Sequence, residues 1–233
     1  MKPAPLHYAL ALHTTTPDLG LALGPWEREK SDPEQRRFVV LPLGREMAAT
    51  LHQHLQTFLE PQVWSDLKCL AVAKGPGGFT GTRLGLVTAR TIAQQLDLPL
   101  FALSTLETLA LHHALRDHHA ALGTWTHTVA VSLPAQRGQL FGAIYRCFAD
   151  RPPEAIVLDD VYEPTAWQST LERHGPDQVL TLTATDPLAH SVETLLDLAE
   201  RYWHLEDPSL SRPHWLQALP FYGQHPAVLE THK

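Results

Sequence analysis

The chain has 233 residues, of which 44% are hydrophobic and 18% are charged, the balance of an ordinary soluble globular protein. Its formal charge is −7 with neutral histidines, so it lacks the basic excess with which a protein that binds nucleic acid by itself neutralises phosphates. This length allows one large domain or two modest lobes, and a role in an RNA pathway would depend on a protein partner.

Three short apolar strands are predicted at the start of the chain. Tyr8–Leu12 and Leu19–Leu23 are joined by residues 14–18, a segment rich in threonine with a proline and an aspartate, so they are expected to form a hairpin. A polar loop with two prolines follows over Gly24–Arg36, and Arg37–Leu43 is the third strand.

Helices and strands alternate after the third strand. Arg45–Leu59 has apolar residues at helical spacing, and Pro61 ends this helix. The elements predicted next are a strand over Cys69–Ala73, a helix from an N-cap at Thr80 to about Leu96, a strand over Pro99–Leu103, and a helix to about His119 that starts at a capping box, Ser104–Glu107.

The second half repeats this order with weaker patterns. Its predicted elements are strands over Thr128–Leu133, Gln139–Phe148, Ala155–Val161 and Gln178–Leu182, and helices over Pro164–Arg173 and Leu188–Trp203. Three strands followed by alternating helices and strands is the plan of a ribonuclease-H-like lobe. We therefore expect a two-lobe α/β protein, with a first lobe over residues 1–120 and a divergent, degenerate second lobe over 121–233. The boundary is expected within 120–126, and the last segment is expected either to lie irregularly on the surface or to return to the first lobe.

The most distinctive local pattern is a glycine-rich turn between a strand and a helix. The residues predicted to build this turn are Gly75, Gly77, Gly78, Thr80 and Gly81. Glycines allow positive φ angles and close approach of another backbone, and free N–H groups at a helix start can hold an anion, so the turn could bind phosphate. It lacks the Gly-Lys-Ser/Thr ending of a P-loop. The alternative is a tight turn that lets the helix pack closely on its sheet.

The 15 histidines and two cysteines do not predict a metal site. The sequence contains no His-Glu-x-x-His motif, and it contains no nucleophile beside a base. Cys69 and Cys147 lie in apolar strands without zinc spacing, so we expect buried free thiols. The apolar run near the N-terminus is too short for a signal peptide or a membrane span, so the expected location is the cytosol, without a membrane partner. The three close histidine pairs fall on different faces of predicted helices: His52/His54, His112/His113 and His118/His119.

A longer string around the turn resembles the signature of a known family. The string Gly75-Pro-Gly-Gly-Phe-Thr-Gly-Thr-Arg-Leu-Gly-Leu-Val-Thr-Ala-Arg90 is similar to the signature of the TsaB (YeaZ) family. Residues Ala93–Glu107, the hairpin Ala9–Leu23 and the tail segment Leu219–Val228 resemble the same family. The resemblance is strong over about residues 8–107, weak in the second lobe, and returns briefly at the tail.

The resemblance implies a fold and a role. Members of this family have the two-lobe, actin-like (ASKHA) fold and serve as a scaffold for TsaD, the homologous subunit that holds ATP and metal and carries out the transfer. An ATPase, TsaE, joins the assembly. The modified base is the adenosine next to the anticodon of tRNA, which becomes threonylcarbamoyladenosine. By resemblance, then, this chain would be a pseudo-enzyme subunit that binds no cofactor alone and meets tRNA only through the complex.

Departures from the pattern of active relatives favour this non-catalytic role. His13 stands where the superfamily's first hairpin supplies an aspartate, and a neutral imidazole cannot give the anionic oxygen that Mg²⁺ prefers. Asp18 lies on the turn and is better explained as a turn residue. Pro134-Ala-Gln-Arg-Gly-Gln replaces a stretch that is acidic in relatives, and Gln224 replaces a tail arginine. The alternative function is an enzyme, either an actin-fold ATPase or a metallopeptidase-like protein.

If catalysis is absent, function must lie in a surface. The helices over Arg45–Leu59 and Thr80–Leu96 are expected to meet the equivalent pair of TsaD in a helical bundle, or to pair with a second copy in a homodimer. The residues predicted for this partner interface are Met47, Leu51, Leu55, Arg83, Leu84, Val87 and Arg90.

Overall fold

The computed structural model describes residues 7–26, 36–117, 124–183, 186–205 and 213–223. The sequence predictions for part of the 24–36 loop, for most of the 120–126 boundary, and for His118, His119 and Gln224 lie outside these residues. None of the helices within the described ranges combines the length and apolarity needed to cross a bilayer.

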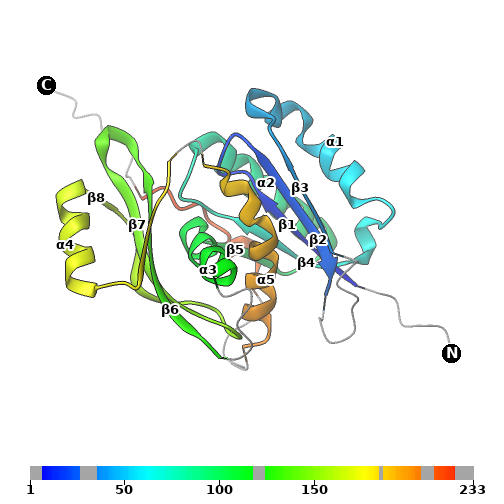
Figure 1. The fold of residues 1–233 in the computed structure, drawn as a ribbon. Coiled ribbons are helices and arrows are strands. Elements are labelled where there is room, and N and C mark those ends of the chain that lie inside the picture. Colours follow the sequence, from blue (N-terminus) through cyan, green and yellow to red (C-terminus); the bar gives the residue numbers. More distant parts are fainter. Residues whose placement is uncertain (1–6, 27–35, 118–123, 184–185, 206–212, 224–233) are drawn as a thin grey trace, which may run out of the picture.

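The first lobe contains a five-stranded sheet in the order β3-β2-β1-β4-β5. The strands β1, β2 and β3 pair antiparallel, whereas β4 and β5 run parallel to β1. Their bounds are Tyr8–His13, Leu19–Pro25, Arg37–Leu41, Leu67–Ala73 and Leu100–Leu103. Helices α1 (Met47–Leu59) and α2 (Phe79–Leu96) cover one face of this sheet, as Figure 1 shows.

The second lobe contains a four-stranded sheet in the order β8-β7-β6-β9. β6 pairs antiparallel with β7 and β7 with β8, and β9 runs parallel to β6. The strand bounds are Thr126–Pro134, Leu140–Phe148, Glu154–Tyr162 and Gln178–Thr181. Helix α4 (Pro164–His174) packs on the outer face, over β7 and β8. The predicted two-lobe α/β class is confirmed.

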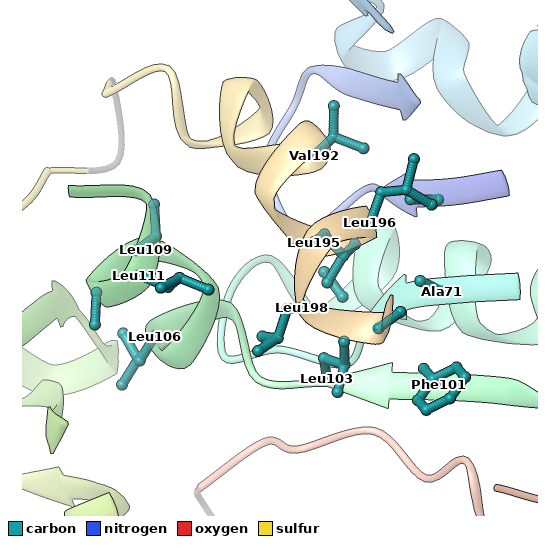
Figure 2. Packing of buried hydrophobic residues seen from close by; sticks show 14 of the residues in the cluster. Ala71, Phe101, Leu103, Leu106, Leu109, Leu111, Val192, Leu195, Leu196 and Leu198 are labelled. Carbon is teal, nitrogen blue, oxygen red and sulfur yellow. The ribbon is translucent and has the colours of Figure 1, made fainter. Parts of the chain in front are cut away.

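Two helices lie between the sheets, and each packs on the sheet of the other lobe (Figure 1). Helix α3 (Thr105–Asp117) follows the first sheet but packs on β6 and β7, whereas α5 (Val192–Trp203) follows the second sheet but packs on β1 and β2. Figure 2 shows Leu111 of α3 directed toward α5, which carries Leu198, and both belong to one buried cluster that includes residues of both sheets. Because each fully buried leucine contributes about 1.5–3 kcal/mol, this shared core holds the lobes together.

The end of the described chain lies against the first lobe. The N–H of Leu100 donates to the carbonyl oxygen of Pro213 at 3.0 Å, so residue 213 lies beside the outer edge of the first sheet. The N–H of Phe221 donates to the carbonyl oxygen of Lys74 at 2.8 Å. Residues 213–222 therefore run from the far edge of β5 to the start of the glycine-rich turn.

Candidate functional site

A cleft of about 1020 Å³ lies between the two lobes. The first lobe contributes the β1–β2 turn and the start of α2, and the second contributes the β6–β7 hairpin and the end of β8. The polar and charged residues along it include Thr15, Thr16, Arg83, Gln136, Arg137, Gln139, Asp160 and Tyr222. Much of the remaining wall is apolar, as is usual for binding clefts.

The glycine-rich turn packs against the β1–β2 turn at the first-lobe wall of the cleft. The N–H of Gly78 donates to the carbonyl oxygen of Thr15 at 2.7 Å. A Cβ atom on Gly77 would lie 2.5 Å from that same oxygen, and one on Gly81 would overlap the carbonyl oxygen of Thr14. The glycines are therefore needed for close backbone packing, and an N–H group that could have held an anion already has a protein partner.

Gly75 has a further reason to be glycine. Its φ angle is +98°, a conformation that L-residues with side chains rarely adopt. A Cβ atom there would lie 2.6 Å from the carbonyl oxygen of Phe221. The returning C-terminal segment therefore fits against the turn only because the turn has no side chain at this position.

The predicted cap at Thr80 is wrong, and the predicted cap at Ser104 is correct. Helix α2 begins at Phe79, with Gly78 as its N-cap, so Thr80 is an exposed residue of the first turn. The Ser104 hydroxyl accepts hydrogen bonds from the N–H groups of Leu106 and Glu107, at 3.0 and 3.2 Å. The N-cap of α2 could not be recognised in the sequence, because its residue, Gly78, has no side chain to accept a capping hydrogen bond.

His13 is fully buried at the end of β1. Burial lowers the pKa of its imidazole to about 4, and its Nε2 lies 3.4 Å from the Thr15 hydroxyl oxygen. The imidazole is therefore neutral near pH 7, and it does not fit the role of an anionic metal ligand. Among the described residues, no group of three or more His, Cys, Asp or Glu side chains is arranged to hold a metal ion.

The predicted interface residues divide into two groups. Met47, Leu51 and Leu55 are buried in this chain's own core beneath α1, with exposed fractions of 4%, 0% and 1%. In this structure their side chains cannot contact a partner, so we revise this part of the predicted surface. The apolar spacing that suggested a partner face reflects packing on the chain's own sheet.

The predicted residues on α2 are more accessible. The side chain of Val87 is 60% exposed, and those of Leu84 and Arg90 are partly exposed. Phe79, which the sequence prediction omitted, is 51% exposed. Of helices α1 and α2, α2 is therefore the one with large apolar side chains that are more than half exposed.

Arg83 joins α2 to the C-terminal segment. Its guanidinium carbon lies 3.9 Å from the ring centre of Phe79 and 5.3 Å from that of Tyr222, and its Nε donates to the Tyr222 hydroxyl at 2.6 Å. Such cation–π contacts contribute about 0.5–1 kcal/mol at exposed sites. Arg83 therefore holds the C-terminal segment on α2 at the edge of the cleft.

A buried polar network, which was not predicted from the sequence, joins α3, α5, β7 and β8, and its residue Asp159 directly precedes the cleft residue Asp160. The Tyr202 hydroxyl of α5 donates to Glu107 of α3 at 2.5 Å, and the Tyr145 hydroxyl of β7 donates to Asp159 of β8 at 2.5 Å. The Ser104 hydroxyl, which caps α3, also donates to Asp159. Burial raises the pKa of Glu107 to about 7. In the sequence, Glu107 follows Ser104 at the spacing of a capping box, so its hydrogen bond with Tyr202 was not predicted.

Comparison with known proteins places this geometry in a family. A family model described as "TsaD: tRNA N6-adenosine threonylcarbamoyltransferase" matches residues 55–177, more than half of the chain. YeaZ from Pseudomonas aeruginosa has the same fold, with a TM-score of 0.67 and 21% identity, over 93% of this chain and 100% of that one. A second solved protein from that organism, described as similar to peptidase YEAZ, gives a TM-score of 0.68 at 22% identity, over 94% of this chain and 100% of that one.

Two curated relatives carry the same name, "tRNA threonylcarbamoyladenosine biosynthesis protein TsaB". The protein from Bacillus subtilis (strain 168) is 40% identical over 107 residues, which is 46% of this chain and 42% of that protein. The protein from Escherichia coli (strain K12) is 29% identical over 153 residues, which is 58% of this chain and 63% of that protein. The matched segments thus span less than two thirds of either relative. With its two-lobe actin-like fold and TsaD-type domain, the chain belongs to the TsaB (YeaZ) family.

Proposed function

We propose that this chain is a non-catalytic subunit in the formation of threonylcarbamoyladenosine in tRNA. In this account it works with a TsaD-type protein and a TsaE-type ATPase, and the TsaD-type subunit holds ATP and metal and transfers the threonylcarbamoyl group. The names of the curated relatives support the pathway. The net charge of −7 agrees with contact to tRNA through the complex and not through this chain alone.

The observation that carries the non-catalytic role is the packing of Thr15 on the glycine-rich turn. The carbonyl oxygen of Thr15 accepts the hydrogen bond of the Gly78 N–H, and it would lie 2.5 Å from a Cβ on Gly77. A phosphate at this position would have to displace backbone from its hydrogen bond. The neutral, buried His13 beside Thr15 adds no charge that could hold Mg²⁺.

The surface we assign to the partner is the exposed side of α2. Phe79 and Val87 are large apolar residues that are more than half exposed, and solvent exposure of neighbouring apolar side chains is typical of interaction sites. Leu84 and Arg90 flank them, whereas the exposed residues of α1 include His52 and other polar side chains. The partner is the equivalent helix of the TsaD-type protein, and a homodimer through α2 is the competing use of the same face.

Depletion of this protein followed by mass spectrometry of tRNA nucleosides tests the proposal. We expect threonylcarbamoyladenosine to fall and to be restored by the wild-type chain. Retention of the modified nucleoside at its normal level would contradict the proposal.

One observation favours an enzyme instead, namely the size of the cleft. A volume of about 1020 Å³ would accommodate a nucleotide. Calorimetry with ATP on the isolated chain separates the two functions. Tight Mg²⁺-dependent binding would favour an actin-fold ATPase, whereas absence of heat at millimolar ATP would favour the scaffold.

A further inference from the structure

The walls of the cleft are connected beneath it by buried acidic groups from both lobes. Asp159 directly precedes Asp160 and Val161, which line the cleft on the second lobe. Lys74 directly precedes Gly75 in the first lobe, and its carbonyl oxygen accepts the hydrogen bond of Phe221, next to the cleft residue Tyr222. A change in this network would therefore act on both walls.

The hydrogen bonds of the network cross between structural units. Glu107 stands on α3, which follows the first sheet, and accepts from Tyr202 on α5, which follows the second sheet. Asp159 on β8 accepts from Ser104 at the start of α3 and from Tyr145 on β7. Glu107, Ser104 and Tyr145 are 7%, 4% and 5% exposed, so little water reaches these bonds while the cleft keeps this width.

The charges that act on Glu107 do not balance when it is ionised. Burial raises the pKa of Glu107 most, the hydrogen bond from Tyr202 lowers it, the charge of Asp159 raises it, and that of Lys74 lowers it. An ionised Glu107 would leave two buried carboxylates with one lysine among these groups. The titratable groups that face Glu107 from the neighbouring elements are Tyr202 on α5, Asp159 on β8, Lys74 after β4, and Tyr145 and Cys147 on β7.

We propose that Glu107 and Asp159, together with Lys74, form a proton-controlled link between the lobes that sets the width of the cleft. Burial raises the pKa of Asp159, whereas the hydrogen bonds from Ser104 and Tyr145 and the charge of Lys74 lower it, so these groups stabilise its carboxylate. When Glu107 is protonated, the site holds this one carboxylate and one lysine, and the lobes stay closed. When Glu107 loses its proton, the two carboxylates repel each other in a medium that screens them poorly. Admitting water from the cleft side relieves this repulsion, because Asp159 is the neighbour of two cleft residues. The cleft therefore widens as pH rises.

Fluorescence energy transfer between the lobes tests this link. Gln94 on α2 and Gln168 on α4 are exposed and stand on the outer faces of the two sheets, so dyes on Gln94→Cys and Gln168→Cys report the separation of the sheets. The native Cys69 and Cys147 are fully buried, and burial raises the pKa of the Cys147 thiol to about 12, so dyes will react with the introduced cysteines. We expect transfer in the full-length chain to fall with a midpoint near pH 7.

Three variants test whether Glu107 and its neighbours control the pH-dependent change in energy transfer. Glu107→Gln should abolish the pH-dependent change. Asp159→Asn should also abolish the change, because it removes one of the two carboxylates whose repulsion opens the cleft. Tyr202→Phe should move the midpoint to higher pH, because the hydrogen bond from Tyr202 lowers the pKa of Glu107 and this variant lacks it. Glu193→Gln, at an exposed glutamate on α5, is the control and should titrate like the wild type.

Loss of the pH-dependent change in Asp159→Asn, together with a higher midpoint in Tyr202→Phe, would establish the link even if Glu107→Gln fails to fold. Unchanged transfer between pH 5.5 and 8.5 in the wild type, or the same midpoint in all folded variants, would overturn the proposal. The measurement uses neither tRNA nor a partner, so its result is independent of the proposed function.

Discussion

The carbonyl oxygen of Thr15 accepts a hydrogen bond from the Gly78 N–H at 2.7 Å, and this bond joins the first hairpin to the start of α2. In a phosphate-binding turn the N–H would face a ligand. Here it faces the chain's own backbone. The turn therefore fixes the position of α2, the helix whose exposed side we assign to the partner.

Alanine at Gly77 should destabilise the chain, whereas alanine at Gly78 should not. A Cβ on Gly77 would lie 2.5 Å from the Thr15 oxygen, but a Cβ on Gly78 would lie 3.4 Å from it, an ordinary contact. Overpacking of this kind costs about 1–3 kcal/mol. Urea unfolding monitored by tryptophan fluorescence measures both free energies of unfolding. Equal values for Gly77→Ala and Gly78→Ala would show that the turn is not tightly packed.

A substitution at Leu51 should lower stability, whereas one at Val87 should reduce partner binding without lowering stability. Leu51 is fully buried, so Leu51→Ala should lower the free energy of unfolding by about 2–5 kcal/mol. Val87 is 60% exposed, so Val87→Glu should change stability by no more than about 0.5 kcal/mol and yet reduce co-purification with the TsaD-type partner. Undiminished co-purification of a folded Val87→Glu chain would remove α2 from the interface.

Glu107→Gln should stabilise the chain increasingly as pH rises. Because the pKa of Glu107 is raised in the folded state, from 4.5 to about 7, the folded state binds its proton more tightly than the unfolded state. The stability it contributes is complete below pH 4.5 and is lost as pH rises to about 7. The difference in free energy of unfolding between Glu107→Gln and wild type should therefore grow over this range, by at most about 3 kcal/mol. A constant difference between pH 4.5 and 7.5 would contradict the shifted pKa.

Replacement of Arg137 should stabilise the β6–β7 hairpin. Arg137 has a φ angle of +58° and precedes Gly138 at +76°, so the turn has two successive left-handed residues, as in a type I′ hairpin. Asparagine tolerates this conformation better than arginine, and Arg137→Asn should raise the free energy of unfolding by up to about 1 kcal/mol. Thermal melting at pH 7 checks this, and a lower melting temperature would mean that the arginine side chain makes stabilising contacts.

Much of the fold could be predicted because the local patterns agree with the tertiary structure. The hairpin of β1 and β2, the strand β4 and the Ser104 cap all follow from runs of apolar residues and turn or cap residues. The second-lobe strands β6, β7 and β8 were also predicted in the right order. Helix boundaries were less accurate, since α5 is preceded by a separate 3₁₀ turn over Leu188–Ser191.

The site could be predicted only in part, because its contacts join residues far apart in sequence. The apolar stripe on α1 indicated a buried face but could not tell a partner from the chain's own sheet, and Leu51 proved to face the sheet. Glu107 and Asp159 come together only because α3 crosses to the second lobe. The stacking of Arg83 with Tyr222 required the C-terminal segment to return across the first lobe.

A reconstituted reaction tests the central claim most directly. Purified TsaD-type and TsaE-type proteins are supplied with tRNA, ATP and the threonylcarbamoyl donor, with or without this chain, and the modified nucleoside is measured by mass spectrometry. We predict that the chain alone forms no product and that the partners form it substantially only when the chain is added. Product formed by this chain alone, or equal product without it, would contradict its role as a non-catalytic subunit.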